Sequence, residues 1–408
     1  MDVVVTRLVA LLVVASLVAI VARRLHLPYT VGLVVAGLGL SLLGVGGGEN
    51  LTHDLIFIVI LPPLLFEATL GIPWHEFRRD ALPVLVLASF GVVVAAAVVA
   101  TGMATVLAWP FAAALIFGTL IAATDPVAVI AMFKDSRVSG RVRLLVESES
   151  LLNDGVAAVL FALVLAWTGG QPLSAGSAAV DLLVTAGGGT LVGLACGALA
   201  VLLGGRISDH LVETGLSAVA AYGSFLAAEH WHLSGILATV AAGLMVKYPA
   251  MLVPRRWRAS RPPQRKDNRF LVEFWEFAAF IANSGVFLLI GLAVPAESFT
   301  RVGVGPLITA VLLVLLGRAM VVYGICLPFG RTRWAVSPAQ QHVLWWGGLR
   351  GALGLALALA LPHRLAYRDE IVTTTFAVVV FSVVVQGITM PALLRRLGIL
   401  RRPDPVAR

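Results

Sequence analysis

Four acidic residues lie deep inside long apolar runs of this sequence: Glu67, Asp125, Glu149 and Asp154. The last two belong to a segment rich in side-chain oxygen atoms, Glu147-Ser-Glu-Ser-Leu-Leu-Asn-Asp-Gly-Val. In a helix, Ser150 and Asp154 are four positions apart and share a face, and Asn153 flanks them. Hard metal cations bind oxygen ligands. The segment therefore predicts a cation site built on the Asp154 carboxylate, with Ser150 and Asn153 beside it.

Glu149 does not belong to the same face of this predicted helix. It lies five positions before Asp154, about 140° around a helix of 3.6 residues per turn, so it needs a partner of its own. The basic residues inside apolar runs are Arg7, Arg318 and Arg350. Ionisable groups in hydrocarbon are costly, so each is a candidate functional residue. The residues alone leave open that these acids and bases only pair to stabilise packing.

Two segments predict interrupted helices. In Ala-Thr-Asp125-Pro126 the proline lacks a backbone N–H and clashes with the preceding turn, so the helix should break near Thr124. A glycine cluster surrounds Arg350 in the segment from 345 to 354. Broken helices inside a membrane line protein-enclosed cavities, where free carbonyls bind cations and half-helix dipoles need compensating charge. Asp125 and Arg350 supply opposite charges at the two predicted breaks.

The elements that would position these residues are membrane helices. Of 408 residues, 59% are hydrophobic and 13% are charged, and the mean hydropathy is +0.95. Soluble domains carry about 25% charged residues. A helix needs about 20 apolar residues to cross a bilayer. Thirteen runs approach or exceed this length: 3–22, 28–45, 52–71, 80–107, 110–133, 143–167, 178–204, 211–229, 232–247, 271–294, 302–328, 338–361 and 370–393.

Basic residues predict the orientation of these spans. With the N-terminus outside, 24 of the 30 Lys and Arg lie in cytoplasmic segments, and only Arg301, Arg364 and Arg368 lie in external ones. We therefore expect a multi-pass protein of the plasma membrane, the inner membrane in a bacterium, with the C-terminus in the cytoplasm. No cleavable signal peptide is expected, because Arg23 and Arg24 follow the first span. Because the basic residues lie in short connections, the net charge of +8 does not indicate nucleic-acid binding.

The span count predicts an internal repeat. Spans 5 and 12 are seven apart, so they run in opposite directions. Spans 1–6 and 8–13 would then form two inverted six-helix repeats with span 7 as a linker, the pattern that secondary transporters use. The expected organisation is one all-α transmembrane domain over residues 1–398, with broken, crossing helices in spans 5 and 12, and a short cytoplasmic tail over 399–408.

The four segments that carry these features resemble a known family. Leu-Pro-Pro-Leu-Leu-Phe-Glu (61–67), Ala-Thr-Asp-Pro-Val-Ala-Val (123–129), Glu-Ser-Leu-Leu-Asn-Asp-Gly (149–155) and Gly-Gly-Leu-Arg-Gly-Ala-Leu (347–353) are similar to motifs of the monovalent cation:proton antiporters of the NhaP and NHE type. The motifs occur in the order that the family has. The resemblance extends over nearly the whole chain.

The resemblance implies roles for individual residues. Asp154 would carry the ion and the proton beside Asn153, and Ser150, Glu67 and the Thr124 backbone would complete the Na+ site. Glu149 would pair with Arg318, and Asp125 and Arg350 would neutralise half-helix ends. The resemblance also implies a homodimer, with the monovalent cation, the proton and the lipid bilayer as further partners. No cofactor is expected.

The resulting hypothesis is Na+ (or Li+) exchange for H+ by competition at one carboxylate. Removal from water favours the protonated form of a carboxyl group, whereas a bound cation favours the ionised form. One titrating acid predicts one-for-one, electroneutral exchange. K+/H+ exchange by the same architecture is the alternative, and a cation channel is a remote one. An enzyme is not expected, because the sequence has neither G-x-S-x-G nor H-E-x-x-H.

Overall fold

The computed structural model describes residues 2–25, 28–43, 54–135, 138, 140–170, 174–204, 209–249, 269–293 and 302–399. Within these ranges every regular element is a helix, as the apolar runs predict. The predicted cytoplasmic tail lies outside the described residues except for Ile399, and so does the side chain of Arg7.

Each predicted run contains helix, and the two predicted interruptions are present. The first part of the chain forms α1 (Asp2–Leu25), α2 (Tyr29–Leu42), the π-helical η1 (Leu55–Ile60), α3 (Leu61–Gly71), α4 (Trp74–Ala88), α5 (Phe90–Val106), α6 (Phe111–Leu120), α7 (Val127–Asp135) and α8 (Arg141–Thr168). The second part forms α9 (Ala175–Gly204), α10 (His210–His230), α11 (Gly235–Lys247), α13 (Arg269–Leu292), α15 (Val304–Phe329), α16 (Pro338–Trp346), α17 (Ala352–Leu359), α18 (Arg368–Phe381), the π-helical η3 (Ser382–Gln386) and α19 (Gly387–Arg396).

Seven helical stretches of the described residues are long and apolar enough to cross a membrane: 74–106, 141–168, 176–204, 210–230, 269–292, 304–329 and 368–396. Shorter apolar helices include α2, α6 and α11. Many large apolar side chains on the outer faces are exposed, such as Leu183 on α9 and Leu312 on α15. This distribution is the one that a helix bundle in lipid requires. The chain is therefore multi-pass, while the count of thirteen spans and the inverted repeat stay predictions.

Local sequence explains where the two interrupted helices stop and restart. The stretch from Ile121 to Pro126 separates α6 from α7, and the N–H of Ile130 donates to the Pro126 carbonyl to begin α7. Ser337 caps α16 in a reciprocal capping box with Gln340. Residues 347–351, three of them glycine, separate α16 from α17. The helix breaks at the Asp125-Pro126 and glycine-cluster segments are thus confirmed.

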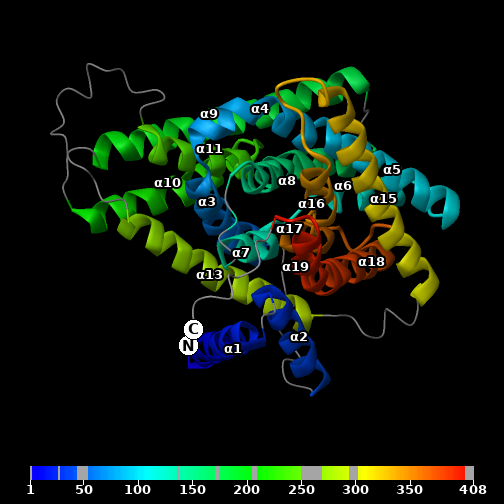
Figure 1. Ribbon diagram of the computed structural model, residues 1–408, viewed down its shortest axis with the longest axis horizontal. Coiled ribbons are helices and arrows are strands. Elements are labelled where there is room, and N and C mark those ends of the chain that lie inside the picture. The colour runs from blue at the N-terminus through cyan, green and yellow to red at the C-terminus, as the bar shows by residue number, and fades with distance from the viewer. Residues whose placement is uncertain are drawn as a thin grey trace.

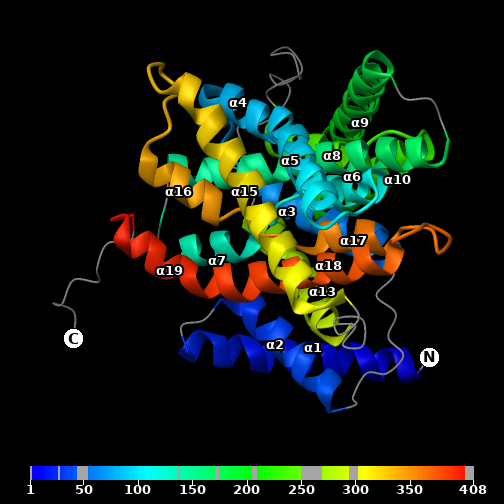
Figure 2. The same cartoon turned by 90° about the vertical axis from the view of Figure 1, so that its right-hand side faces the viewer.

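Helix α8 lies among elements from both parts of the chain (Figure 1). It contacts α4 and α6 from the first part and α11, α16 and α17 from the second. Helices α1 and α2 lie at one edge of the molecule in both views (Figures 1 and 2), where α2 packs on α13. Ser150, Asn153 and Asp154 are therefore carried by a helix that packs against elements from both parts of the chain.

Candidate ion-binding site

The two interrupted segments touch each other directly. The N–H of Asp125 donates to the Leu349 carbonyl at 2.7 Å, which joins the break before α7 to the break before α17. The Asp125 side chain packs on the backbone of Gly351, where an added Cβ would lie 2.1 Å from Asp125 Oδ2. Glycine is therefore required at 351 for the two breaks to cross at this distance.

The charged residues at the breaks compensate half-helix ends. The buried Arg350 side chain donates to the Ala122 and Ala123 carbonyls at 2.7 and 3.0 Å, beyond the C-terminal end of α6. Asp125 Oδ1 accepts from the N–H of Val127, the first residue of α7, at 2.9 Å. A cation at a helix C-terminus and an anion at an N-terminus are both favourable. These positions agree with the neutralising roles that the resemblance implies.

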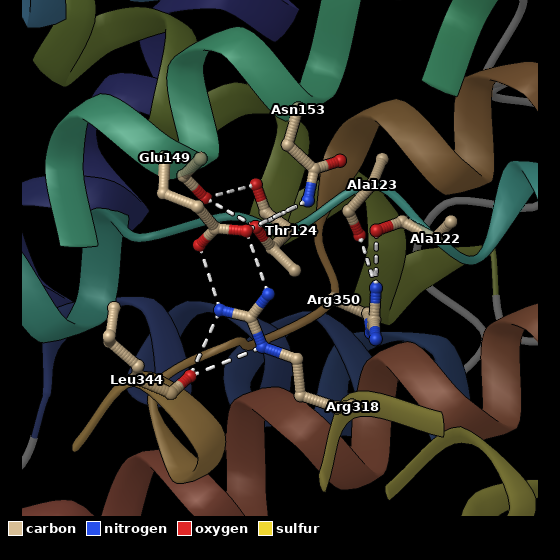
Figure 3. A network of polar contacts seen from close by, with 9 residues as sticks. Ala122, Ala123, Thr124, Glu149, Asn153, Arg318, Leu344 and Arg350 are labelled. Carbon is tan, nitrogen blue, oxygen red and sulfur yellow. Dashed lines mark hydrogen bonds and ion pairs between the residues drawn. The ribbon is translucent and has the colours of Figure 1, made fainter. Parts of the chain in front are cut away.

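Arg318 joins α15 to α8 and α16. Its guanidinium donates to Glu149 Oε1 and Oε2 at 2.7 and 2.8 Å, and to the Leu344 carbonyl in the last turn of α16 at 3.0 and 3.2 Å (Figure 3). Both charged side chains are buried, and Arg318 packs on Gly348, where an added Cβ would lie 2.6 Å from Arg318 Nε. The separate partner that helical geometry demands for Glu149 is therefore present.

Ser150 and Asn153 hold Thr124 in place. Ser150 Oγ lies 2.6 Å from both the hydroxyl and the carbonyl oxygen of Thr124. Asn153 Nδ2 donates to Thr124 Oγ1 and to Glu149 Oε1, each at 3.3 Å (Figure 3). Ser150 Oγ is thus turned to Thr124, whereas the Asn153 Oδ1 atom is buried and has no hydrogen-bond partner among the described residues. That the oxygens of Ser150, Asn153 and Asp154 bind one ion together stays a prediction.

Asp154 faces a cavity of about 270 Å³. Its Oδ1 is buried and makes no hydrogen bond among the described residues. The wall also includes Thr124, Asp125 and Glu67, but neither Ser150 nor Asn153. Glu67 is thus brought to the same cavity as Asp154. In the described part of the chain, no three His, Cys, Asp or Glu side chains come together closely enough to form a metal cluster.

Sequence reasoning missed several residues of this cavity. Glu147, Glu276 and Asn283 line it, and among the described residues its wall contains no Lys, Arg or His. Glu147 lies near the start of the predicted run 143–167, and Glu276 lies near the start of the run 271–294. Acidic residues near span ends were therefore the available signal. Outside this cavity, the buried Gln386 of η3 was also missed; its Nε2 donates to the Trp346 carbonyl at the end of α16.

The fold and site together define a class of protein. Two interrupted helices that cross at buried, compensated charges beside an acidic cavity form the architecture of a secondary transporter. The sequence places the chain more specifically: residues 11–396 match the family model described as sodium/hydrogen exchanger, transmembrane, and the chain belongs to this family.

Individual relatives agree with this assignment. The chain is 37% identical to the Na+/H+ antiporter ApNhaP of Aphanothece halophytica over 95% of its own length and 73% of the relative. It is 34% identical to the Na+/H+ antiporter NhaH of Halobacillus dabanensis over 98% of its length and 99% of the relative. The solved structure of the sodium proton antiporter MjNhaP1 from Methanocaldococcus jannaschii at pH 8 has the same fold, with a TM-score of 0.78 at 20% identity over 97% of this chain and 99% of that one.

Proposed function

We propose that this protein exchanges Na+ (or Li+) for H+ across the membrane and that both ions compete for the Asp154 carboxylate. The observation that carries the proposal is the buried Asp154 Oδ1, which has no hydrogen-bond partner in the described part of the chain and faces a cavity lined by further acids beside the crossing of two broken helices. The similarity to proteins named Na+/H+ antiporters supports Na+ as the substrate over K+.

The competition follows from the surroundings of the carboxylate. Away from water the ionised form is costly, so Asp154 takes up a proton unless a cation replaces it. Oxygens of Thr124 and Glu67 at the same cavity would complete the cation site, and Ser150 and Asn153 would hold Thr124 for this purpose. Either ion neutralises Asp154, so the loaded carrier changes its access from one side to the other more easily than the empty one.

The arrangement in the membrane is part of the proposal. We propose thirteen spans over residues 1–398, with spans 1–6 and 8–13 as inverted repeats and the N-terminus outside. Three segments assigned to the cytoplasmic side meet, which supports this arrangement. Arg141 donates to Asp80 Oδ1 at 2.8 Å and to the Trp334 carbonyl at 3.0 Å, and the Trp334 indole donates to the Arg79 carbonyl at 3.0 Å. Location in a bacterial inner membrane and the homodimer stay predictions.

The test is ion exchange by the purified protein in proteoliposomes. The Asp154→Asn variant should lose exchange, because an amide neither binds nor releases a proton, while its yield and elution in detergent stay normal. Asp181→Asn is the matched control, since Asp181 is exposed on α9. Na+, Li+, K+ and Rb+ should be compared over a range of pH. Exchange retained by Asp154→Asn contradicts the competition, and large uncoupled currents would identify a channel.

Electroneutrality needs a separate measurement. One elementary charge moved across 100 mV corresponds to about 2.3 kcal/mol, enough to change a rate many-fold. We expect the initial rate of Na+/H+ exchange to be the same when the membrane potential is clamped at zero and at about 100 mV of either sign. A steep dependence on potential would show that each cycle moves net charge, which contradicts one-for-one exchange.

A further inference from the structure

Helix α13 forms part of the cavity wall, and no residue of this helix was expected in the ion site. Glu276, Ala279, Phe280 and Asn283 line the cavity that Asp154 faces. They lie at positions i, i+3, i+4 and i+7, so they form one stripe along the helix. A single face of α13 is therefore turned toward the proposed ion-binding space, with one carboxylate and one amide on it.

Among the described residues that line this cavity, Asp154 and Asn283 each have a buried side-chain oxygen without a hydrogen-bond partner. In both residues this atom is Oδ1. A buried acceptor without a hydrogen bond costs free energy, and most buried acceptors in folded proteins have a partner. An amide turns readily about its last side-chain bond, so its oxygen can face an ion that enters the cavity.

The position of Asn283 is fixed by the packing of α13 on α2. The neighbouring Ser284 Oγ lies 2.6 Å from the Tyr29 hydroxyl. The rings of Tyr29 and Phe280 stack with their centroids 5.4 Å apart. About two turns beyond Ser284, the Gly291 backbone packs directly on α2, since an added Cβ would lie 2.3 Å from the Val34 carbonyl. These contacts restrain the rotation and register of α13, as a well-positioned ligand requires.

We propose that Asn283 is a further cation-binding residue, whose neutral amide oxygen coordinates the transported ion from α13. This inference rests on the proposed exchange at Asp154 and deepens it. Monovalent and divalent hard cations accept amide oxygens as ligands. A neutral ligand adds to the coordination of the ion without adding a negative charge. Asn283 therefore raises the affinity for the cation while one carboxylate still binds one proton or one cation.

The experiment compares two substitutions that each remove a buried, unpartnered oxygen while preserving side-chain size. Asn283→Leu removes the amide at the cavity, and Thr374→Val removes a hydroxyl on α18 that does not line it. Asn283→Leu should raise the KM for Na+ about tenfold, equivalent to about 1.4 kcal/mol, with kcat within about twofold, the pattern of a lost uniform binding contact. Thr374→Val should leave both values unchanged.

A binding measurement in detergent provides a readout besides transport. Na+ that binds the folded protein raises its melting temperature, so the Na+ concentration at half-maximal shift reports affinity. Asn283→Leu should move this concentration about tenfold upward. If Asn283→Leu does not yield monodisperse protein, Asn283→Ala and Asn283→Ser replace it, because neither adds bulk to the cavity wall.

The outcomes separate this inference from the proposed function. An unchanged KM and an unchanged Na+-dependent melting shift in the Asn283 variants overturn the role of Asn283, even when Asp154→Asn is inactive. The same rise in KM in Thr374→Val also overturns it, since the effect would then be a general consequence of altered packing. Exchange that persists in Asp154→Asn overturns the proposed function itself.

Discussion

The buried ion pair between Glu149 and Arg318 predicts that the effect of Glu149→Gln on stability changes sign when Arg318 is replaced. In Arg318→Met, the Glu149 carboxylate keeps only the Asn153 amide as a donor, and the Leu344 carbonyl loses both of its contacts with Arg318. Removing one member of a buried pair costs about 3–5 kcal/mol, because the other charge is left uncompensated. In the Arg318→Met background, Glu149→Gln should therefore stabilise the protein, although it destabilises the wild type. Arg318→Met should be the least stable of the three variants.

Thermal unfolding of the purified protein in detergent measures this cycle, with tryptophan fluorescence as the signal. At about 2 cal/mol/K per residue, a loss of about 3–5 kcal/mol in a chain of 408 residues lowers the melting temperature by about 4–6 °C. The double variant should recover part of the loss of Arg318→Met. If Glu149→Gln lowers the melting temperature equally in both backgrounds, the two residues are not coupled and the reasoning is wrong.

Two further predictions concern the helix breaks. Gly351→Ala should reduce both the exchange rate and the melting temperature, because the added Cβ would clash with Asp125 and overpacking costs about 1–3 kcal/mol. Gly324→Ala on α15 is the control, since a Cβ added there meets nothing within 4 Å. Equal behaviour of the two variants would refute the crossing. Arg350→Met should lower the exchange rate at least tenfold, since two carbonyls beyond α6 lose their donor at about 1–3 kcal/mol each. Arg350→Lys should retain part of the rate. Wild-type rates in Arg350→Met would contradict a role of Arg350 at the break.

Much of the fold could be predicted because its signals are local. Apolar runs identify helices whatever their neighbours are, and Asp125-Pro126 stops a helix by removing a backbone donor. The rotation of Glu149 away from Asp154 also follows from helix geometry alone. Arg318 as its partner required the resemblance to a family, because nothing in the spacing relates residue 149 to residue 318.

The rest of the site depends on contacts between distant segments. Helix geometry predicts that Ser150 shares a face with Asp154. It does not reveal that Ser150 Oγ lies within hydrogen-bond distance of the hydroxyl and the carbonyl oxygen of Thr124. The Asn153 amide nitrogen likewise donates to the Thr124 hydroxyl. Glu276 and Asn283 were missed because the cavity exists only once α13 packs beside α3 and α2. Local periodicity carries no information about such a space.

The fixed charges of the site bear on the proposed competition of Na+ and H+ for the Asp154 carboxylate. Arg318 is held by Glu149 and Leu344, Arg350 is held by the carbonyls beyond α6, and Asp125 accepts from the first amide of α7. If either arginine instead formed a permanent ion pair with Asp154, that carboxylate would be neutral without a substrate, and the carrier could change access empty. Engagement of each arginine elsewhere leaves the charge of Asp154 to be neutralised by the transported ions. Under the proposed competition, the structural pairs are therefore a condition for coupling Na+ movement to H+ movement.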